Sequence, residues 1–439
     1  MAETREIYKT LDFALRVGEM LLSNGAGAPD VSATMGSIVH HLGLRGASVD
    51  VTFTALTISY QPSVEDPPLF QTRHVTQRDI DYDDLTAVDQ LVTSLLRDEV
   101  GRDEARTTLA QIASSGHRTP RWAITASWGA IGAGIALLLG GDWVVVLIAS
   151  VAAIGIEIMQ RFLACRRFPF FYQQVAGGLL ATLLAVGVAA TDVSVDPSLV
   201  ITASIVMLLA GLGFIGAVQD ALTGFYITAG ARLLEVMIAT AGIIVGVSGG
   251  LTVGGMLGVD ITIEPGIAEW SHLPVMTFGA ALSAAAFAFS AYAPARVLLP
   301  IAVISGAATA IYFLMTQQGF GRAWASAIAA ITIGIVSYSV AGWARVPPLV
   351  IVVSCIVPLL PGLSIYRALS LMADGDTTGM LALVTAAAIA ISLSSGVILG
   401  EYVAQPLKRE ARRLEQRLAG PRLVGPLRAR AVRKKQSGN

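Results

Sequence analysis

The stretch Val357–Leu369, VPLLPGLSIYRAL, interrupts a part of the chain that otherwise consists of apolar segments of membrane-spanning length. It contains two prolines, a glycine and a full positive charge, which are Pro358, Pro361, Gly362 and Arg367. Proline has no backbone N–H, and inside a helix it also frees a carbonyl one turn earlier. Non-helical backbone at membrane depth is tolerated only where it is buried in protein or lines a water-filled cavity. The stretch therefore predicts a broken membrane helix at a polar site.

An earlier stretch repeats this pattern. SLVITASIVMLLAGLGFIGAV, from Ser198, aligns with PLVIVVSCIVPLLPGLSIYRAL, from Pro348, and both copies read Leu-Val-Ile near the start and Leu-Leu-x-Gly-Leu later. Gly211 and Gly213 predict a softer break at the matching position of the first copy. Two five-helix halves of opposite topology, with the substrate site at their interface, are found in many secondary transporters. Chance similarity between two apolar sequences is the alternative.

The composition places most of the chain in lipid. Of its 439 residues 54% are hydrophobic and only 14% are charged, whereas soluble domains average about 25% charged residues. The charges concentrate at the two ends: residues 1–120 contain 10 Lys/Arg and 17 Asp/Glu, and the tail from residue 405 contains 11 and 2. Such a basic tail is typical of an anchor on anionic lipid headgroups, and we expect no nucleic-acid partner.

Ten apolar segments follow one another from Ala123, and they predict about ten spans. Their cores are 123–140, 143–160, 172–190, 198–218, 228–248, 274–291, 297–315, 323–341, 347–366 and 378–402. Arginines follow the second, sixth and eighth segments, and the basic tail follows the tenth. Because positive charges favour the cytoplasmic side, we expect both termini in the cytoplasm and a multi-pass protein of the cytoplasmic (inner) membrane. No secretory signal opens the chain.

These observations divide the chain into four predicted parts. Residues 1–120 form a cytoplasmic α+β domain, 121–273 a first five-span half with its outer loop, 274–404 a second five-span half, and 405–439 a basic cytoplasmic tail. The fold class is thus an α-helical polytopic membrane protein of two inverted halves, with an N-terminal α+β domain.

The N-terminal part shows both helix and strand patterns. TREIYKTLDFALRVGEMLLSNG and APDVSATMGSIVHHLGL predict helices that end at glycine. SVDVTFTALTISYQ predicts one strand, FQTRHVTQ predicts a weaker partner, and two further helices are expected over 84–100 and 103–115. The acidic run 79–84, DIDYDD, is typical of a solvated loop and helix N-terminus. Without cysteine or glutamate at ligand spacing around His40 and His41, we expect no metal, and we expect no cofactor.

Five ionisable residues lie in or beside the spans, where charges are costly and usually functional. They are Glu157, Asp220, Arg232, Glu235 and Arg367. The three acids are candidate proton carriers, and the two arginines are candidates for a carboxylate. Local alternatives remain, because Glu157 is four residues from Arg161, Arg232 is three from Glu235, and Asp220 could be interfacial.

The substrate site is predicted where the two breaks meet. Helix ends exposed there offer N–H and C=O groups, which suit the carboxylate and ammonium of a zwitterion. The predicted lining consists of small or helix-breaking residues with the two arginines nearby: Gly211, Gly213, Pro361, Gly362, Ser364, Arg232 and Arg367.

Three stretches resemble one family of bacterial membrane proteins. GEMLLSNGAGAPDVSATMGSIVHHLGL, followed by VDVTFTALTISYQ, resembles the N-terminal domain of the threonine/serine exporter family. AVQDALTGFYITAGARLLEVMIATAGIIVG is similar to that family's stretch after its fourth span, with Asp220, Gly224, Arg232 and Glu235 at its motif positions. VPLLPGLSIYRAL resembles the Pro-Gly motif of the family's second half. The chain departs from the pattern at Ala210, where a proline would stand.

The resemblance implies an antiporter that exports L-threonine and L-serine, driven by the proton motive force, and not an enzyme. It leaves gating or assembly as the role of the N-terminal part.

Export of small dicarboxylates, which would depend more on arginines, is an alternative. A membrane-tethered enzyme is another, although residues 1–120 show no paired nucleophile and base. A sensor or scaffold would not need two matched helix breaks. The expected partners are the amino-acid substrate, protons and membrane lipids, and assembly into a homo-oligomer stays open.

Overall fold

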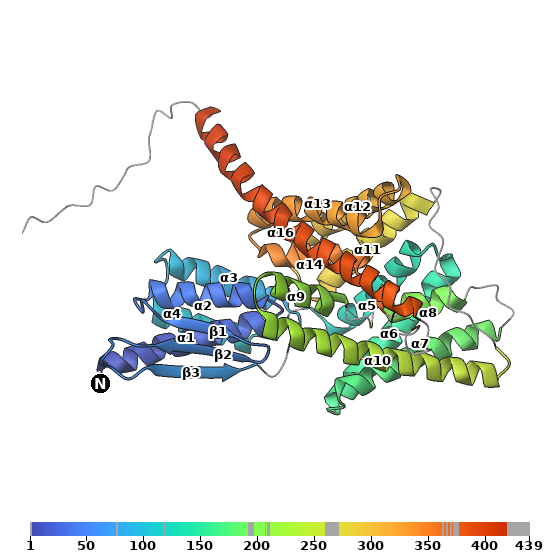
Figure 1. Ribbon diagram of the computed structural model, residues 1–439, viewed down its shortest axis with the longest axis horizontal. Helices are drawn as coiled ribbons and strands as arrows, with labels where there is room; N and C mark the ends of the chain where they lie inside the picture. Colours follow the sequence, from blue (N-terminus) through green and yellow to red (C-terminus); the bar gives the residue numbers. More distant parts are fainter. Residues whose placement is uncertain are drawn as a thin grey trace, which may run out of the picture.

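The computed structural model describes residues 2–75, 78–117, 119–191, 197–206, 208, 211–259, 272–361, 364–365, 368, 371 and 377–418. A small region of helices and strands lies at one end of the molecule, and a bundle of long helices extends from it (Figure 1). We call the first, residues 2–117, the N-terminal region, and the second, helices α5 to α16, the membrane region.

The N-terminal region combines four helices with one sheet. The helices are α1 (Ala2–Ser23), α2 (Ala28–His41), α3 (Tyr82–Leu96) and α4 (Arg102–Ser114). Strands β1 (Ser48–Val51), β2 (Ala55–Tyr60) and β3 (Leu69–His74) form an antiparallel sheet in the order β1-β2-β3. Apolar side chains of α1 and α2, such as Phe13 and Met35, are fully buried against β2 residues Leu56 and Ile58.

The prediction of a single strand over SVDVTFTALTISYQ is wrong. A turn at Thr52–Thr54 divides it into β1 and β2, which pair with Val49 opposite Ile58. The turn contains no glycine, proline or asparagine, and its threonines and phenylalanine favour strands. For that reason the sequence pattern did not reveal it. The weaker partner strand is β3, which pairs with β2.

The acidic run before α3 is less solvated than expected. Asp81 caps the helix, because its side chain accepts hydrogen bonds from the backbone N–H groups of Asp83 and Asp84 at 3.1 Å. Asp81 is nevertheless buried, and Tyr82 is fully buried with its ring against α14 of the membrane region. The helix N-terminus was therefore predicted, but its contact with the membrane region was not.

The membrane region is almost entirely helical. Its helices are α5 (Arg121–Leu138), α6 (Trp143–Cys165), α7 (Phe170–Ala189), α8 (Pro197–Val206), α9 (Gly211–Leu222), α10 (Tyr226–Met256), α11 (Leu273–Ser290), α12 (Ala295–Gln317), α13 (Arg322–Ala344), α14 (Pro348–Ile356) and α16 (Thr378–Leu418), with a 3-10 turn, η2 (Val357–Leu359), after α14. Among the described residues, seven helices are long and apolar enough to cross a membrane: α6, α7, α10, α11, α12, α13 and the Thr378–Ala404 part of α16. The chain is therefore a polytopic membrane protein.

Both expected breaks are visible in the backbone. The segment predicted over 198–218 is interrupted, since α8 ends at Val206 and α9 begins at Gly211. The segment predicted over 347–366 ends as a helix at Ile356, tightens into η2, and becomes extended at Leu360, with φ −60° and ψ 135°. An extended residue is what a following proline imposes, because the Pro361 ring excludes the helical conformation before it.

The same helix pairs pack together in both parts of the membrane region. Three pairs of the first part, α7–α10, α5–α6 and α7–α8, have a counterpart in the second part. These counterparts are α13–α16, α11–α12 and α13–α14, in the same order. Glycines allow the close approach in each: a Cβ on Gly178 would lie 2.8 Å from the carbonyl oxygen of Ile243, and one on Gly334 would lie 2.5 Å from that of Val397. α5 and α11 pack on each other.

The N-terminal region is joined to the membrane region by specific contacts. The backbone N–H of Tyr82 donates to Ala291 O at 2.8 Å, and Gln90 Nε2 donates to Arg345 O at 3.0 Å. One continuous cluster of buried apolar side chains runs from α1 and α3 into α11 and α14. The two regions therefore share part of their core.

Candidate functional site

The two helix breaks contact each other. A Cβ added at Gly211, the first residue of α9, would lie 3.1 Å from Leu360 Cβ. Leu360 immediately precedes Pro361, which is itself buried. A Cβ on Gly213 would lie 3.0 Å from Val236 Cγ2 of α10. Gly211 thus lets the Leu360 side chain of the second break approach the first break closely.

The remaining predicted lining residues are only partly described. Ser364 is half-buried, and the neighbouring Ile365 N–H donates to Pro361 O at 3.0 Å, so a helical turn resumes after the second break. Gly362 and Arg367 lie outside the described residues.

An ion pair joins α9, the helix that begins at the first break, to α10. Arg232 Nη1 of α10 is 3.0 Å from Asp220 Oδ2 of α9, and Asp220 is 1% exposed. The two helices can pair because Gly224, at φ +92°, takes the left-handed conformation in the tight turn between them. A Cβ on Gly216 would lie 2.7 Å from Arg232 Nη1, so the guanidinium lies over this glycine.

The N-terminal region also reaches this ion pair. The backbone N–H of Ala28, at the start of α2, donates to the Asp220 carboxylate. Ala28 is fully buried. A helix N-terminus carries partial positive charge and free N–H groups, so it stabilises a carboxylate. Asp220 is therefore held by a cation from α10 and by a helix end from α2. We call Ala28, Arg78, Asp220, Arg232 and Glu235 the junction cluster.

Arg78 brings a second cation to the junction cluster. Its guanidinium lies 3.8 Å from the centre of the Phe53 ring, which belongs to the turn between β1 and β2. Burial, and after it the charge of Arg232, lowers the pKa of Arg78, while the acids Glu235 and Asp220 raise it. Sequence reasoning missed Arg78 because it lies far along the chain from α9 and α10. The nearby Asp30 is exposed, but the surrounding protein removes part of its hydration, and this raises its pKa.

The two other candidate acids have different surroundings. Glu157 Oε1 lies 3.1 Å from Arg161 Nη1, and Thr125 Oγ1 donates to Glu157 Oε2 at 3.2 Å. This is the local i,i+4 pair left open by the sequence. Glu235 is exposed and, within the described ranges, forms no ion pair. Its expected neighbour Arg232 pairs with Asp220 instead.

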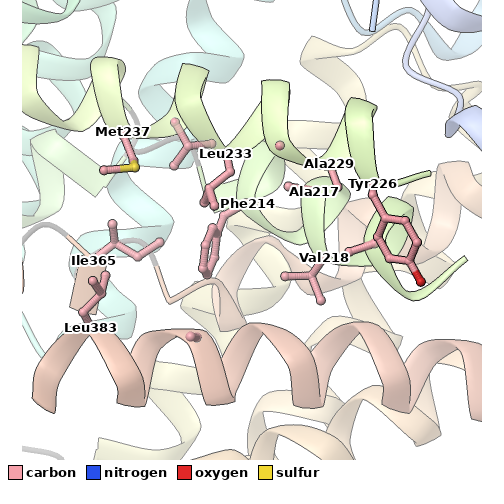
Figure 2. A pocket seen from close by; sticks show the side chains of 13 residues that line it. Phe214, Ala217, Val218, Tyr226, Ala229, Leu233, Met237, Ile365 and Leu383 are labelled. Atoms are coloured by element: carbon pink, nitrogen blue, oxygen red, sulfur yellow. The ribbon is translucent and has the colours of Figure 1, made fainter. Parts of the chain in front are cut away.

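An apolar cavity of about 470 Å³ lies close to the breaks (Figure 2). Figure 2 shows side chains of α9 and α10, such as Phe214 and Met237, facing Leu383 of α16 and Ile365. A zwitterion placed there would lose the hydration of both charged ends without polar partners. The cavity is thus a poor site for an amino acid.

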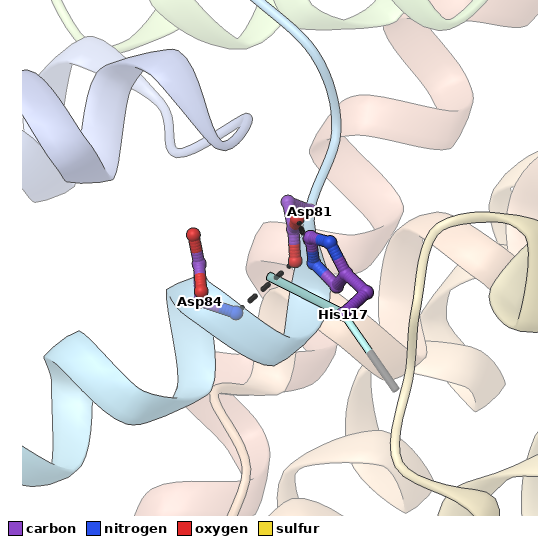
Figure 3. A group of neighbouring side chains, drawn as sticks. All are labelled: Asp81, Asp84 and His117. Carbon is purple, nitrogen blue, oxygen red and sulfur yellow. Dashed lines mark hydrogen bonds and ion pairs between the residues drawn. The ribbon is translucent and has the colours of Figure 1, made fainter. Parts of the chain in front are cut away.

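Asp81, Asp84 and His117 form a third group of ionisable residues (Figure 3). Their donor atoms lie within 4.8 Å of one another, and the donor types would suit a metal cation. However, Asp81 Oδ1 caps α3, and Asp81 Oδ2 lies 2.5 Å from His117 Nε2. The His117 ring stacks on Tyr292 of the α11–α12 loop at 3.8 Å. These contacts give the group a structural role, which is to hold α3 against that loop.

Comparisons with known proteins agree with this architecture. Residues 12–254 match a family described as "Putative threonine/serine exporter", and residues 276–403 match one described as "Threonine/Serine exporter, ThrE". A protein of Mycobacterium tuberculosis named "Probable threonine/serine exporter" is 36% identical over 428 residues, which cover 94% of this chain and 80% of that protein. The "Threonine/serine exporter" of Corynebacterium glutamicum is 31% identical over 420 residues, with 94% and 86% covered. No solved structure matches the chain.

Proposed function

This chain belongs to the threonine/serine exporter family, and we propose that it exports L-threonine and L-serine across the cytoplasmic membrane in exchange for protons. The family consists of transporters and not of enzymes. The observation that carries the proposal is the contact between the two helix breaks at Gly211 and Leu360, beside the helices that hold the buried Asp220–Arg232 pair.

The recurring helix pairs support two inverted halves. In this view α5 to α10 form the first half and α11 to α16 the second, and α5 and α11 are equivalent helices that pack on each other at the pseudo-twofold axis. The predicted domain limits at residues 120, 273 and 404 follow from this division into two halves. The site would then lie where the halves meet, and small rotations of one half against the other would expose it to either side in turn.

The breaks would supply polar groups that an unbroken helix lacks. The first N–H groups of α9, from Gly211 and Gly213 onward, have no partner within their own helix, and neither do the last carbonyls of α14. N–H groups at a helix start suit a carboxylate, and carbonyls suit an ammonium group. Pro361, Gly362 and Ser364 would complete the lining, with Arg367 near its end.

Coupling to protons would act through the buried ion pair. Asp220 is our first candidate for the proton carrier, because it is buried and holds a cation that the substrate could also use. Charged Asp220 would receive the ammonium group of the substrate while Arg232 holds its carboxylate. Protonation of Asp220 from the outer side would then release the substrate, so that proton and substrate bind in turn, as exchange requires. Glu157 and Glu235 remain candidates, but the first is already paired with Arg161 and the second is exposed.

The rest of the chain fits the same arrangement. Both termini would lie in the cytoplasm, where the basic tail contacts anionic headgroups. The N-terminal region would then cover the cytoplasmic ends of α9 and α10 through Ala28 and Arg78 and act as a gate. Assembly into a homo-oligomer is compatible with this arrangement.

Transport into inside-out membrane vesicles tests the proposal. Vesicles containing the purified chain are given labelled L-threonine, L-serine or succinate, with and without an imposed proton gradient. We expect gradient-dependent accumulation of both amino acids and none of succinate. Accumulation of succinate alone would replace the proposal by export of dicarboxylates.

A further inference from the structure

Arg78 is a partly buried arginine that forms no ion pair with any residue the structure describes. Its guanidinium is held against the face of Phe53 at 3.8 Å. Within the described part of the chain, its buried Nη2 has no hydrogen-bond acceptor and Arg78 forms no ion pair. A buried N–H donor without an acceptor is costly, so a molecule that supplies an acceptor there would be bound.

Other arginines of the same area are already satisfied. Arg73 of β3, which lies before Arg78 in the chain, forms ion pairs with Glu19 and Asp12. Arg232, the arginine that α10 contributes to the junction cluster, pairs with Asp220. Arg78 is thus the arginine of the junction cluster that forms no ion pair with a described carboxylate.

The chemistry of this place suits an amino acid. A guanidinium binds a carboxylate through two parallel N–H···O hydrogen bonds, and a stacked aromatic ring fixes the plane in which these hydrogen bonds form. Two acids of the junction cluster, Asp220 and Glu235, act electrostatically on Arg78 and could receive an ammonium group. Cation and anions are therefore arranged for a small zwitterion.

We propose that Arg78 of the N-terminal region binds the carboxylate of the exported amino acid before it reaches the helix breaks. This inference rests on the proposed function. It makes the N-terminal region part of the binding site, since it supplies the first cation that the substrate meets. The substrate would then pass from Arg78 to Arg232 while Asp220 is charged and can receive its ammonium group.

The test compares Arg78→Gln with Arg73→Gln in gradient-driven uptake of labelled L-threonine by inside-out vesicles. Arg73 is the matched control, because it lies in the same region and its charge is neutralised within that region. We expect Arg78→Gln to raise the KM for L-threonine about tenfold or more, with a smaller change in maximal rate. Arg73→Gln should stay within twofold of the unchanged chain.

A second measurement separates carboxylate binding from a structural role. L-threoninol has the side chain and ammonium group of threonine but no carboxylate. It should inhibit uptake by the unchanged chain far more weakly than unlabelled L-threonine does, and Arg78→Gln should reduce this difference. Arg78→Lys keeps the charge but cannot form two parallel hydrogen bonds, so its KM should lie between those of the unchanged chain and of Arg78→Gln. If Arg78→Gln fails to fold, Arg78→Lys takes its place in the test.

The outcomes distinguish this inference from the proposed function. If the unchanged chain transports L-threonine while Arg78→Gln has the same KM and the same discrimination against L-threoninol, Arg78 does not bind substrate and only this inference fails. If the unchanged chain transports neither amino acid, the proposed function itself fails.

Discussion

Arg232 Nη1 lies 3.0 Å from Asp220 Oδ2, and this ion pair joins the first turns of α10 to the last turns of α9. Asp220 is buried and Arg232 is half-buried, and the N–H of Ala28 contacts the Asp220 carboxylate from a third helix. Removing two charges from water costs free energy, which their mutual attraction offsets only while both partners are present. The pair is therefore a point where a single substitution has a large effect.

We expect Arg232→Ala to lower the free energy of unfolding by about 3 kcal/mol, because it leaves the Asp220 carboxylate buried without its cation. Thermal or denaturant unfolding of the purified chain in detergent micelles measures this. The double variant Asp220→Ala with Arg232→Ala should be more stable than Arg232→Ala alone, since it removes both charges. Arg296→Ala is the control, because that side chain is exposed. If Arg232→Ala, the double variant and Arg296→Ala all lowered the free energy of unfolding equally, the ion pair would not stabilise the fold.

Gly211→Leu should reduce export of L-threonine at least tenfold while the protein still reaches the membrane. Already a Cβ would lie 3.1 Å from Leu360 Cβ, so a leucine would force the two breaks apart. Gly187→Leu is the matched control, because a Cβ at Gly187 of α7 meets no atom within 4 Å. Export and the amount of membrane-inserted protein are measured together. A Gly211→Leu variant that exports as well as Gly187→Leu would show that the contact between the breaks is dispensable.

Asp84 gives a prediction about pH and stability. Burial, and then the charge of Asp81, raises the pKa of Asp84 to about 6. The folded chain therefore binds this proton more tightly than the unfolded chain, so the contribution of Asp84 to stability is greatest at low pH and is lost as the pH rises through 6. Asp84→Asn should increase the stability at pH 7.5 by on the order of 1 kcal/mol, a value reduced from the full shift because the side chain is partly hydrated.

The gain from Asp84→Asn should shrink toward pH 4.5, where the wild-type carboxyl is itself protonated. Unfolding temperatures of both chains at the two pH values measure the effect. Asp83→Asn, at an exposed neighbouring position, should show no such dependence. A variant that is less stable at pH 7.5 would mean that the charged form of Asp84 is needed there.

The parts of the fold that were predictable depend on local chemistry. Pro361 disfavours the helical conformation of the residue before it, and the extended conformation of Leu360 follows from that. The ion pair of Glu157 and Arg161 could be predicted from their spacing of four residues on one helix. By the same reasoning, apolar runs of sufficient length identify the long helices of the membrane region.

What the sequence did not reveal depends on contacts between distant segments. Spacing favoured Arg232 with Glu235, but the turn at Gly224 folds α10 back on α9 and brings Asp220 closer to Arg232. Arg78 and Ala28 belong to another region of the chain, and no local pattern relates them to α9. Tyr82 was expected near solvent because its neighbours are acidic, yet packing against α14 buries it.

Proton coupling through Asp220 is the central claim, and Asp220→Asn in reconstituted vesicles tests it most directly. Two activities are compared: uphill accumulation of labelled L-threonine driven by a proton gradient, and exchange of labelled for unlabelled L-threonine without a gradient. We predict that Asp220→Asn loses accumulation but retains exchange, because the amide still occupies the site and cannot carry a proton. Glu157→Gln should retain both. Gradient-driven accumulation by Asp220→Asn at the rate of the unchanged chain would contradict the account.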